Sequence, residues 1–168
     1  MRGDAARIAL AALASMLAPP VLVEAGMWLA TGRFEGEPVF ALATVVVAAP
    51  HVLLLGVPAF LLLRRRGRLG AVNLAMAGFA CGLLPMALVS WPYWTAPPGL
   101  LVQEDWHGHV AILVRDGAPT LAGVLRHLER MFIFGALGAA CALVFWSCWR
   151  CLQHRAGSFP APEPSNPP

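Results

Sequence analysis

The sequence predicts an all-α integral membrane protein, a four-helix bundle with one extracytoplasmic loop segment between the third and fourth helices. Of the 168 residues, 58% are hydrophobic and only 12% are charged, and the mean hydropathy is +0.67. Soluble domains usually carry about twice this charged fraction. The apolar residues fall in four runs of the length that a helix needs to cross a bilayer, about 20 residues. Lipid cannot form hydrogen bonds with exposed backbone N–H and C=O groups. Runs of this length that lack strand-like alternation are therefore expected to be helices.

None of the four predicted spans contains more than one ionisable residue. They belong to a single predicted transmembrane domain, residues 1–155. The tail that follows, residues 156–168, has five prolines in thirteen residues, and this composition favours disorder. The spans are expected at residues 8–30, 39–63, 69–94 and 131–149, with the outer loop at residues 95–130.

The arginines predict the orientation, because positive charge that flanks a span tends to stay cytoplasmic. Four of the twelve arginines would lie on the outer side, together with six acidic residues. We therefore expect a protein of the bacterial inner membrane with both termini in the cytoplasm. The eight arginines expected on the cytoplasmic side are Arg2, Arg7, Arg64, Arg65, Arg66, Arg68, Arg150 and Arg155.

The first span also has features of a secretory signal, because a charged segment up to Arg7 precedes an apolar run with small residues. Cleavage after Ala14 or Ala25 would leave three spans. The apolar run continues to Ala30, however, which is longer than the usual apolar region of a signal, about 7–15 residues. An uncleaved first helix is therefore expected.

Glu24 and His51 are the ionisable residues within the first two spans. A carboxylate in hydrocarbon is costly unless it is protonated or paired, so Glu24 is expected to face the bundle with His51 as its partner. Pro50, beside His51, has no backbone N–H, so the carbonyl of Val46 lacks its helical hydrogen-bond donor. Two interpretations remain, a neutral pair that holds the packing and a proton site. The first is favoured, because one acid near the outer leaflet is a weak indication of transport.

Small residues four apart mark the third and fourth spans as packing helices. Gly78 and Gly82 form a G-x-x-x-G pattern in the third span, and Gly135 and Ala139 have the same spacing in the fourth. This spacing lets helix backbones approach closely. The contact would join helices of one chain or of two chains, and the first arrangement is expected.

The outer loop carries several short structural signals. Pro97-Pro98-Gly99 predicts a turn, residues 109–114 predict a strand, and Asp116-Gly117 predicts a second turn. Thr120 is placed to cap a helix that runs into the fourth span. This segment is where we expect an outside partner to bind.

Asp105, His107 and His109 occupy alternate positions in the outer loop. On an extended strand their side chains would share one face, an arrangement of two histidines and one carboxylate that binds divalent metal. His127 or Glu129 would have to supply a fourth ligand, because three ligands from one strand rarely close a metal site. A solvated loop without tight metal binding is the favoured alternative.

Cys148, Cys151 and His154 lie at the inner end of the fourth span, one heptad after Cys141. A C-x-x-C spacing binds metal or cycles as a dithiol where thiolates are stabilised. At the C-terminal end of a helix, the dipole opposes thiolate formation. We therefore expect these cysteines to pack as apolar residues.

Several four-helix membrane families differ from this chain in their functional residues. Quinone-linked disulfide-oxidising proteins need cysteine pairs in the outer loops, which this chain lacks. Small multidrug resistance transporters also have a glutamate in the first helix, but they are much shorter and lack an outer segment of this length. Di-haem membrane cytochromes need paired histidines within the spans, whereas His51 is alone.

Several stretches of the chain resemble a collection of uncharacterised bacterial four-span inner-membrane proteins. The resemblance covers the second to fourth spans and implies no known activity. The stretches that carry it are His51-Val-Leu-Leu-Leu-Gly-Val-Pro58, Arg64 to Arg68, Ala77-Gly-Phe-Ala-Cys-Gly-Leu-Leu-Pro85 and Gly117-Ala-Pro-Thr-Leu-Ala-Gly123.

The sequence contains no nucleophile–base constellation, phosphate-binding glycine loop or nucleic-acid surface. We therefore expect a structural or interaction component of the membrane, without catalytic activity or a cofactor. Its expected partners are the lipid bilayer and either another membrane protein or a second copy, and not nucleic acid. One alternative is a small proton-coupled or solute transporter that uses Glu24 and His51. Another is a metal-handling or sensing protein that uses the outer-loop histidines.

Overall fold

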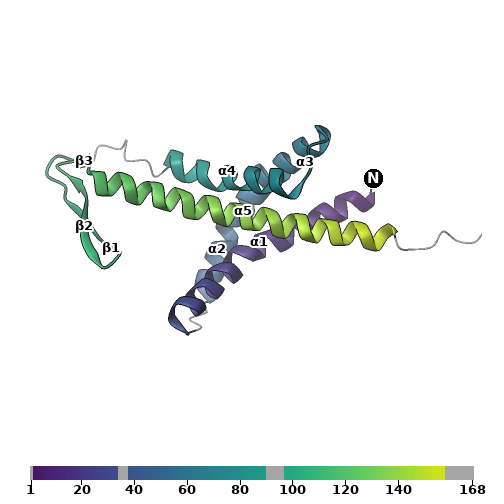
Figure 1. Ribbon diagram of the computed structural model, residues 1–168, viewed down its shortest axis with the longest axis horizontal. Coiled ribbons are helices and arrows are strands. Elements are labelled where there is room, and N and C mark those ends of the chain that lie inside the picture. The colour runs from purple at the N-terminus through teal and green to yellow at the C-terminus, as the bar shows by residue number, and fades with distance from the viewer. Residues whose placement is uncertain (1, 34–37, 90–96, 158–168) are drawn as a thin grey trace, which may run out of the picture. The chain divides into compact units, whose positions relative to one another are not determined.

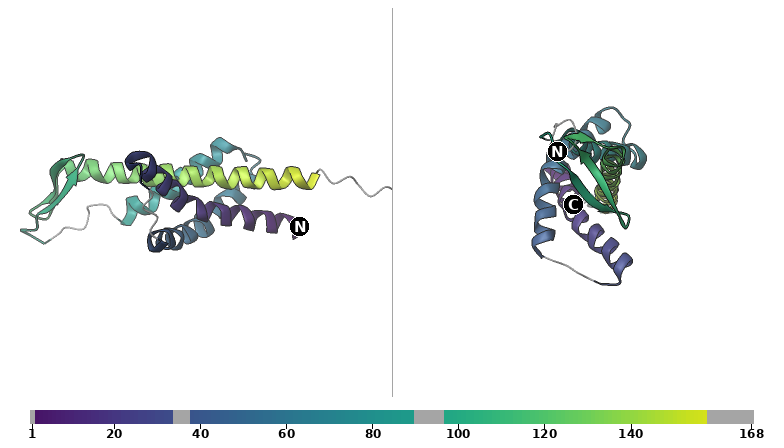
Figure 2. Two further views of the ribbon diagram at one scale, coloured as in Figure 1. Left: turned by 90° about the horizontal axis from the view of Figure 1, so that it is seen from below. Right: turned by 90° about the vertical axis from the view of Figure 1, so that its left-hand side faces the viewer.

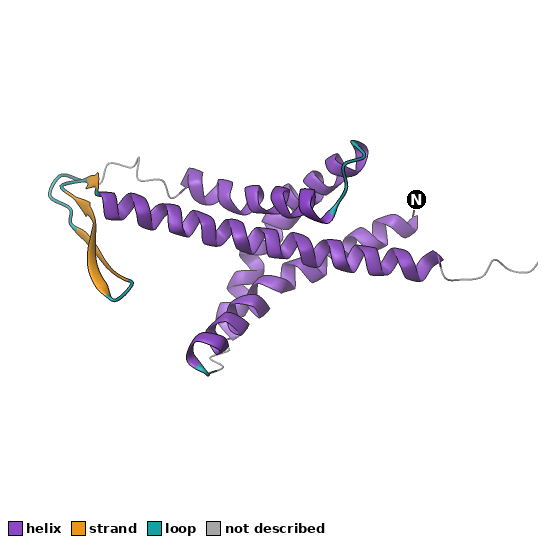
Figure 3. Cartoon of the chain, in the orientation of Figure 1, coloured by secondary structure: helices purple, strands orange, loops and turns teal. Residues whose placement is uncertain are grey.

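The computed structural model describes residues 2–33, 38–89 and 97–157, and the chain is mostly helical (78%). Figure 1 labels its elements, and Figure 3 shows the strands as one short segment among helices. In chain order the elements are α1 (Arg2–Thr31), α2 (Pro38–His51), the π-helical turn η1 (Val52–Gly56), α3 (Val57–Arg65), α4 (Ala71–Val89), β1 (Val102–Trp106), β2 (His109–Arg115), β3 (Ala118–Pro119) and α5 (Leu121–Gly157).

Four helical stretches are long and apolar enough to cross a membrane, which confirms the four helices predicted from the apolar runs. Each run has enough length to satisfy its own backbone, so its helix forms from local sequence. The stretches are Asp4–Leu29, Pro38–Arg65, Ala71–Leu88 and Leu121–His154.

The boundaries of the third and fourth helices differ from the predicted ones. α5 begins at Leu121, directly after the predicted cap Thr120 and ten residues before the predicted fourth span, and continues unbroken to Gly157 (Figure 2). α4 ends at Val89, and residues 90–94 of the predicted third span lie outside the described residues. Residues 158–168 of the predicted tail lie outside them as well.

The second predicted span contains a π-helical turn that sequence reasoning did not identify. α2 ends at His51, and the N–H of Val57 bonds to the carbonyl of Val52, five residues back. Pro58 follows immediately and has no amide hydrogen, so a regular hydrogen bond is missing here. Single π-turns of this kind are frequent at functional sites.

Contacts divide the chain into two compact units. The first unit comprises residues 1–75 and 140–168, so it contains α1, α2, η1, α3 and the second half of α5. The second unit comprises residues 76–139, with most of α4, the strands and the first half of α5.

The core of the first unit is built around Phe60, which is 1% exposed. Its ring centroid lies 4.9 Å from that of Phe145 and 5.2 Å from that of Trp149, distances typical of aromatic packing. The buried Ser15 hydroxyl donates to the carbonyl of Cys141 at 3.1 Å, which joins α1 to α5. The other buried members of this cluster are Ala11, Ala12, Met16 and Leu74.

An ion pair joins the first turn of α1 to the end of α3 in the first unit. The Asp4 carboxylate accepts from Arg64 at 2.7 Å and from Arg7 at 3.3 Å. The N-terminal end of α1 therefore lies beside the arginine-rich turn that follows α3.

In the second unit, α4 and α5 contact each other through glycines. A Cβ atom built at Gly82 would overlap the carbonyl oxygen of Phe134, and one built at Gly138 would overlap the carbonyl oxygen of Gly78. The two backbones therefore touch within one chain, at the small-residue pattern identified in the sequence.

Aromatic rings border this glycine contact. The ring of Phe79 lies against Gly135, where a Cβ atom would come within 2.7 Å of it. Phe79 also packs on Phe132, with ring centroids 5.9 Å apart. Ala139 lies further along α5 and is half-buried.

The predicted outer loop contains a three-stranded antiparallel sheet in the order β1-β2-β3, so the fold is mainly rather than wholly helical. β2 contains the predicted strand at residues 109–114, whereas β1 was not predicted. Two-residue turns, His107-Gly108 and Asp116-Gly117, join the strands, and all four residues have positive φ. This is the pattern of type I′ turns, whose twist matches that of paired strands.

Candidate functional site

The three strands and the first ten residues of α5 form a cluster that we call the headpiece (residues 102–130). Thr120 joins the helix to the sheet: its Oγ1 accepts the N–H of Gly123 at 3.1 Å, and its own N–H donates to the carbonyl of Leu113 at 2.9 Å. Its hydroxyl also donates to the carbonyl of Ile112. The predicted cap therefore also fixes where α5 leaves the sheet.

The helix lies so close to β2 that only glycine fits at position 123. A Cβ atom there would overlap the carbonyl oxygen of Leu113, which is itself buried. The alternate residues Glu104 and Trp106 share one face of β1, and both bond to side chains of α5. This close contact brings the polar groups of β1 within reach of the helix.

Glu104 is the acceptor for two arginines of α5. Its Oε1 accepts from Nη2 and Nε of Arg126 at 2.6 and 3.1 Å, and its Oε2 accepts from Arg130 at 2.5 Å. The hydrogen bonds and charges of these guanidinium groups hold the pKa of Glu104 below its usual value. The carboxylate is therefore charged and doubly paired at neutral pH.

Glu129 is a second acceptor in the headpiece. It receives the indole N–H of Trp106 at 2.6 Å and Nη1 of Arg126 at 2.9 Å. The ring nitrogen Nε2 of His107 lies 3.3 Å from its other oxygen. Arg126 thus bridges both carboxylates and ties the hairpin to α5.

The charges of this network balance, since two carboxylates face two guanidinium groups. The side chains of Glu104, Arg126 and Glu129 are only 22–29% exposed. Arginine and carboxylate groups arranged in this way lock the sheet on the helix and leave little unpaired charge to bind a ligand.

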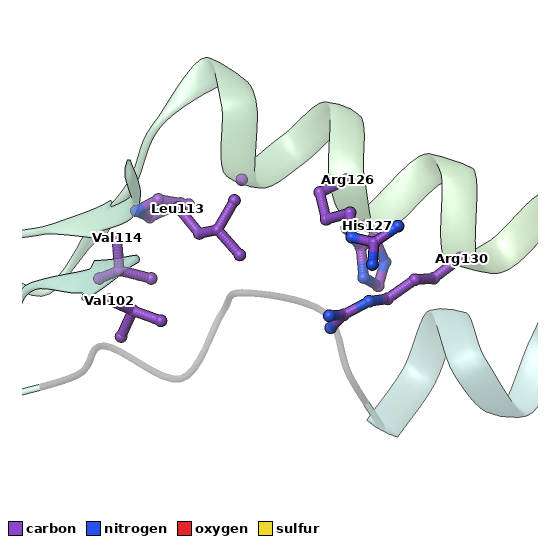
Figure 4. A pocket seen from close by; sticks show the side chains of 8 residues that line it. Val102, Leu113, Val114, Arg126, His127 and Arg130 are labelled. Atoms are coloured by element: carbon purple, nitrogen blue, oxygen red, sulfur yellow. The ribbon is translucent and has the colours of Figure 1, made fainter. Parts of the chain in front are cut away.

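A shallow pocket of about 160 Å³ opens between the sheet and α5 (Figure 4). Apolar side chains of Val102, Leu113 and Val114 line its strand side. Basic side chains from α5 line the other side, including His127, which is 6% exposed. A space of this size has room for a few water molecules or a small solute.

Asp105, His107 and His109 do not lie on one extended strand, which the disfavoured metal site would have needed. Asp105 lies in β1, His107 lies in the hairpin turn with φ of 54°, and His109 begins β2. The reversal of the chain separates residues that a single strand would align. Among the residues that the structure describes, no group of three potential ligands gathers to hold a metal ion.

Glu24 and His51 both lie in the first unit, on α1 and α2. The Nδ1 atom of His51 lies 2.7 Å from the carbonyl oxygen of Val47, and a carbonyl only accepts, so Nδ1 carries the proton and Nε2 of a neutral ring is an acceptor. The Oε2 atom of Glu24 is buried without a hydrogen-bond partner among the described residues. No hydrogen bond or ion pair joins the two side chains in that part of the chain, so their pairing stays a prediction.

The four cysteines are free thiols distributed along α4 and α5. Cys141 and Cys148 are half-buried, and Cys148 packs against the core of the first unit. Cys151 is exposed near the end of α5. His154, the other member of the predicted group, is exposed on the last turns of the same helix.

Sequence reasoning missed the ion network of the headpiece. Glu104 is 22 residues from Arg126 and 26 from Arg130 in the sequence, so no local spacing joins it to them. The signal available was the arginine–acid–arginine pattern at positions 126, 129 and 130, because residues three or four apart share one face of a helix. That pattern indicated a charged helical face, and the predicted loop contained acids to pair with it.

No family model, curated protein or solved structure matches this chain. The resemblance to bacterial four-span inner-membrane proteins therefore stays a prediction. The proposals for function rest on the geometry of the headpiece and the apolar helices.

We expect Glu104→Gln to loosen the headpiece, because an amide cannot accept from both arginines as a carboxylate does. The pKa of Glu104 is lowered by folding, so its contribution to stability is present above pH 4.5 and is lost as the pH falls below that value. Protease cleavage of the sheet should rise severalfold in the variant at pH 7. In the wild type it should rise only below pH 4.5.

Asp105→Asn is the matched control, because Asp105 is exposed on the neighbouring position of β1. Its cleavage should equal that of the wild type across the same pH range. Equal cleavage of Glu104→Gln and Asp105→Asn would show that the ion network does not hold the sheet.

Proposed function

We propose that this chain is a multi-pass inner-membrane protein that presents the headpiece outside the membrane and acts as a structural or interaction component. The observation that carries the proposal is the continuity of α5, which begins in the locked headpiece and is also one of the four helices long enough to cross a bilayer. A recognition element fixed on a helix is positioned more precisely than one on a loop.

The exposed apolar surface of the helices supports membrane insertion. In the most apolar window of Pro38–Arg65, only 6% of the residues are buried within the chain. Leu29 and Leu54 are 77% and 72% exposed. Apolar surfaces of this size need to be covered by lipid or by a protein partner, because their exposure to water is unfavourable.

The orientation with both termini inside rests on the arginine distribution. The ion pair between Asp4 and Arg64 supports one part of it, since it holds the start of α1 beside the arginine-rich turn. A phosphatase fused after Gly117 should be active, and one fused after Gly67 should be inactive. The reverse pattern would overturn the orientation.

The headpiece is suited to contact rather than to catalysis. Its inward face is used by the ion network, while its outward face offers the apolar side chain of Val110, 73% exposed, opposite the exposed acid Asp105 in the register. The predicted partner is another membrane protein or a second copy. Either partner would bind a rigid surface, so little conformational entropy of the headpiece would be lost on binding.

Photo-crosslinking in intact cells tests this proposal. A crosslinking amino acid at Val110 should give one discrete adduct, and the same group at Val72, an exposed position on α4, should not. The mass of the adduct separates a second copy from another protein. No discrete adduct at Val110, or equal adducts at both positions, would contradict an interaction role for the headpiece.

A second candidate function, proton-coupled transport, is favoured by the buried Oε2 of Glu24 and by the π-helical turn that directly follows His51. A bilayer-embedded acid with no bonded partner is a potential site for a proton or a substrate. If the residue carries protons, Glu24→Gln in liposomes should abolish pH-driven dye quenching while leaving the protein folded. Unchanged quenching with Glu24→Gln would exclude this role.

A further inference from the structure

Two opposite faces distinguish the part of α5 that lies in the headpiece. Gly123, Arg126, His127 and Arg130 lie toward the sheet. A second set recurs at intervals of three and four residues and forms what we call the outer stripe: Leu121, Leu125, Leu128 and Phe132. At 100° per residue, the two sets are about 180° apart around the helix axis.

The outer stripe is apolar and exposed. Leu121 is 76% exposed, Leu125 45%, Leu128 38% and Phe132 61%. Phe132 lies within the predicted span of residues 131–149, so the stripe continues from a surface expected to meet lipid into a segment expected to meet water. Exposed leucines at helical spacing over several turns are unusual on a surface in water.

The length of α5 indicates what covers the stripe. The stretch of α5 that could cross a membrane, Leu121–His154, has 34 residues with its charged outer end included, so it is about 51 Å long, while a bilayer with its headgroups is about 40–45 Å thick. Membrane helices tilt by up to about 40°, and a tilt of about 30° would fit the whole stretch, charged outer end included, into that thickness. A tilted helix turns one of its faces toward the membrane surface where it emerges.

The inner end of α5 provides a reference point. Arg150 lies 5.4 Å from the ring centre of Trp146, and paired arginine and tryptophan side chains sit at membrane interfaces. An upright helix would leave the hydrocarbon about 20 residues above Arg150, near Arg130. At a tilt of about 30°, the hydrocarbon takes about 23 residues and the outer headgroup layer about 5 more, which places Leu128 at the hydrocarbon boundary and Leu125 within the outer headgroup layer.

The charges of the headpiece agree with this placement. Arg126, Glu129 and Arg130 lie on the helix face away from the stripe or at its edge. Arg126 and Arg130 pair with Glu104 of the sheet, and Arg126 also pairs with Glu129. The hairpin therefore covers the charged side of the helix. The side that remains open is apolar, as in helices that lie in a membrane interface.

We propose that the outer stripe is a lipid-docking surface: α5 crosses the bilayer tilted, Leu125 and Leu128 enter the outer headgroup and acyl boundary, and the sheet lies on the outer membrane face. This inference rests on the proposed membrane insertion. It differs from that proposal in assigning residues 121–130 to the interface rather than to water.

The test uses the full chain in nanodiscs of phosphatidylcholine, with alanine at the four native cysteines and one bimane-labelled cysteine. The labelled variants are Leu125→Cys and Leu128→Cys in the stripe, Leu143→Cys as the mid-span control and Asp116→Cys as the water control. The quenchers are phosphatidylcholine brominated near the headgroup end of its acyl chains, and iodide in the buffer. If the alanine background does not fold, a fluorescent amino acid at the same positions gives the same readout.

Brominated lipid should lower the fluorescence at Leu128→Cys about twofold and at Leu125→Cys somewhat less, whereas iodide should affect only Asp116→Cys. Iodide quenching in the stripe equal to that at Asp116→Cys would place the stripe in water and overturn the inference. Protection from both quenchers would mean that protein covers the stripe, which also overturns it. Failure of brominated lipid to quench Leu143→Cys would instead overturn membrane insertion itself.

Discussion

Gly138→Val is expected to lower the free energy of unfolding by about 3 kcal/mol, because it forces a side chain against backbone rather than against a movable side chain. A Cβ atom at Gly138 would overlap the carbonyl oxygen of Gly78, and one at Gly82 would overlap that of Phe134. Gly82→Val should therefore have a similar effect. The measurement is reversible unfolding in mixed detergent micelles.

Gly26→Val is the matched control for this prediction. Gly26 also lies within a helix, and a Cβ atom there would meet nothing within 4 Å. Its substitution should change stability little. The loss in Gly138→Val should also be independent of protein concentration, since the contact lies within one chain, whereas an interface between chains would make it concentration-dependent. Equal stability of Gly26→Val and Gly138→Val would contradict the close approach of α4 and α5.

Gly123→Val is expected to release the sheet from α5 and to cost about 2 kcal/mol in the headpiece. The added side chain would overlap the carbonyl oxygen of Leu113, so β2 would have to move. That movement would break the cap at Thr120 and carry Glu104 away from Arg126. Limited proteolysis should then cut the hairpin rapidly, while the circular dichroism signal of the helices is retained.

The control for Gly123→Val is Leu121→Val, which introduces the same side chain in the same turn of α5. Leu121 is 76% exposed, so the substitution adds no overlap, and the hairpin should remain resistant. If both variants are cut at the same rate, the contact between Gly123 and Leu113 does not hold the headpiece together.

The variants Gly123→Val and Gly138→Val should also differ in the crosslinking of the headpiece. Release of the sheet by Gly123→Val should remove the crosslinked adduct at Val110 if a partner recognises the locked headpiece. Loss of the α4–α5 contact by Gly138→Val acts at the other end of the second unit. An adduct that survives only in Gly138→Val would therefore assign recognition to the headpiece rather than to the apolar helices.

Local sequence was sufficient to predict the helices and the turn at Asp116-Gly117. Each apolar run is long enough to form a helix whose backbone satisfies itself, so its existence depends on few distant contacts. The turn at Asp116-Gly117 and the cap at Thr120 were also predictable, because a type I′ turn and a helix cap depend on only a few neighbouring residues. The spacing of Gly78 and Gly82 likewise identified a surface where another backbone would approach.

Other features depend on partners that are distant in the sequence. β1 contains Glu104 and Asp105 and has no apolar alternation, so only its pairing with β2 and its bonds to α5 make it a strand. The charges of Arg126 and Arg130, near the start of α5, are paired with Glu104 of β1, a partner that no local pattern identified.

The sequence by itself therefore determined four apolar helices, the turn at Asp116-Gly117, the cap and the small-residue surface, since each depends on backbone geometry within a short segment. The tertiary structure decided the strand β1 and the ion network. The physical reason is that a charged group is stabilised by whatever lies opposite it in space, and residues 22 to 26 positions apart carry no local signal that they will meet.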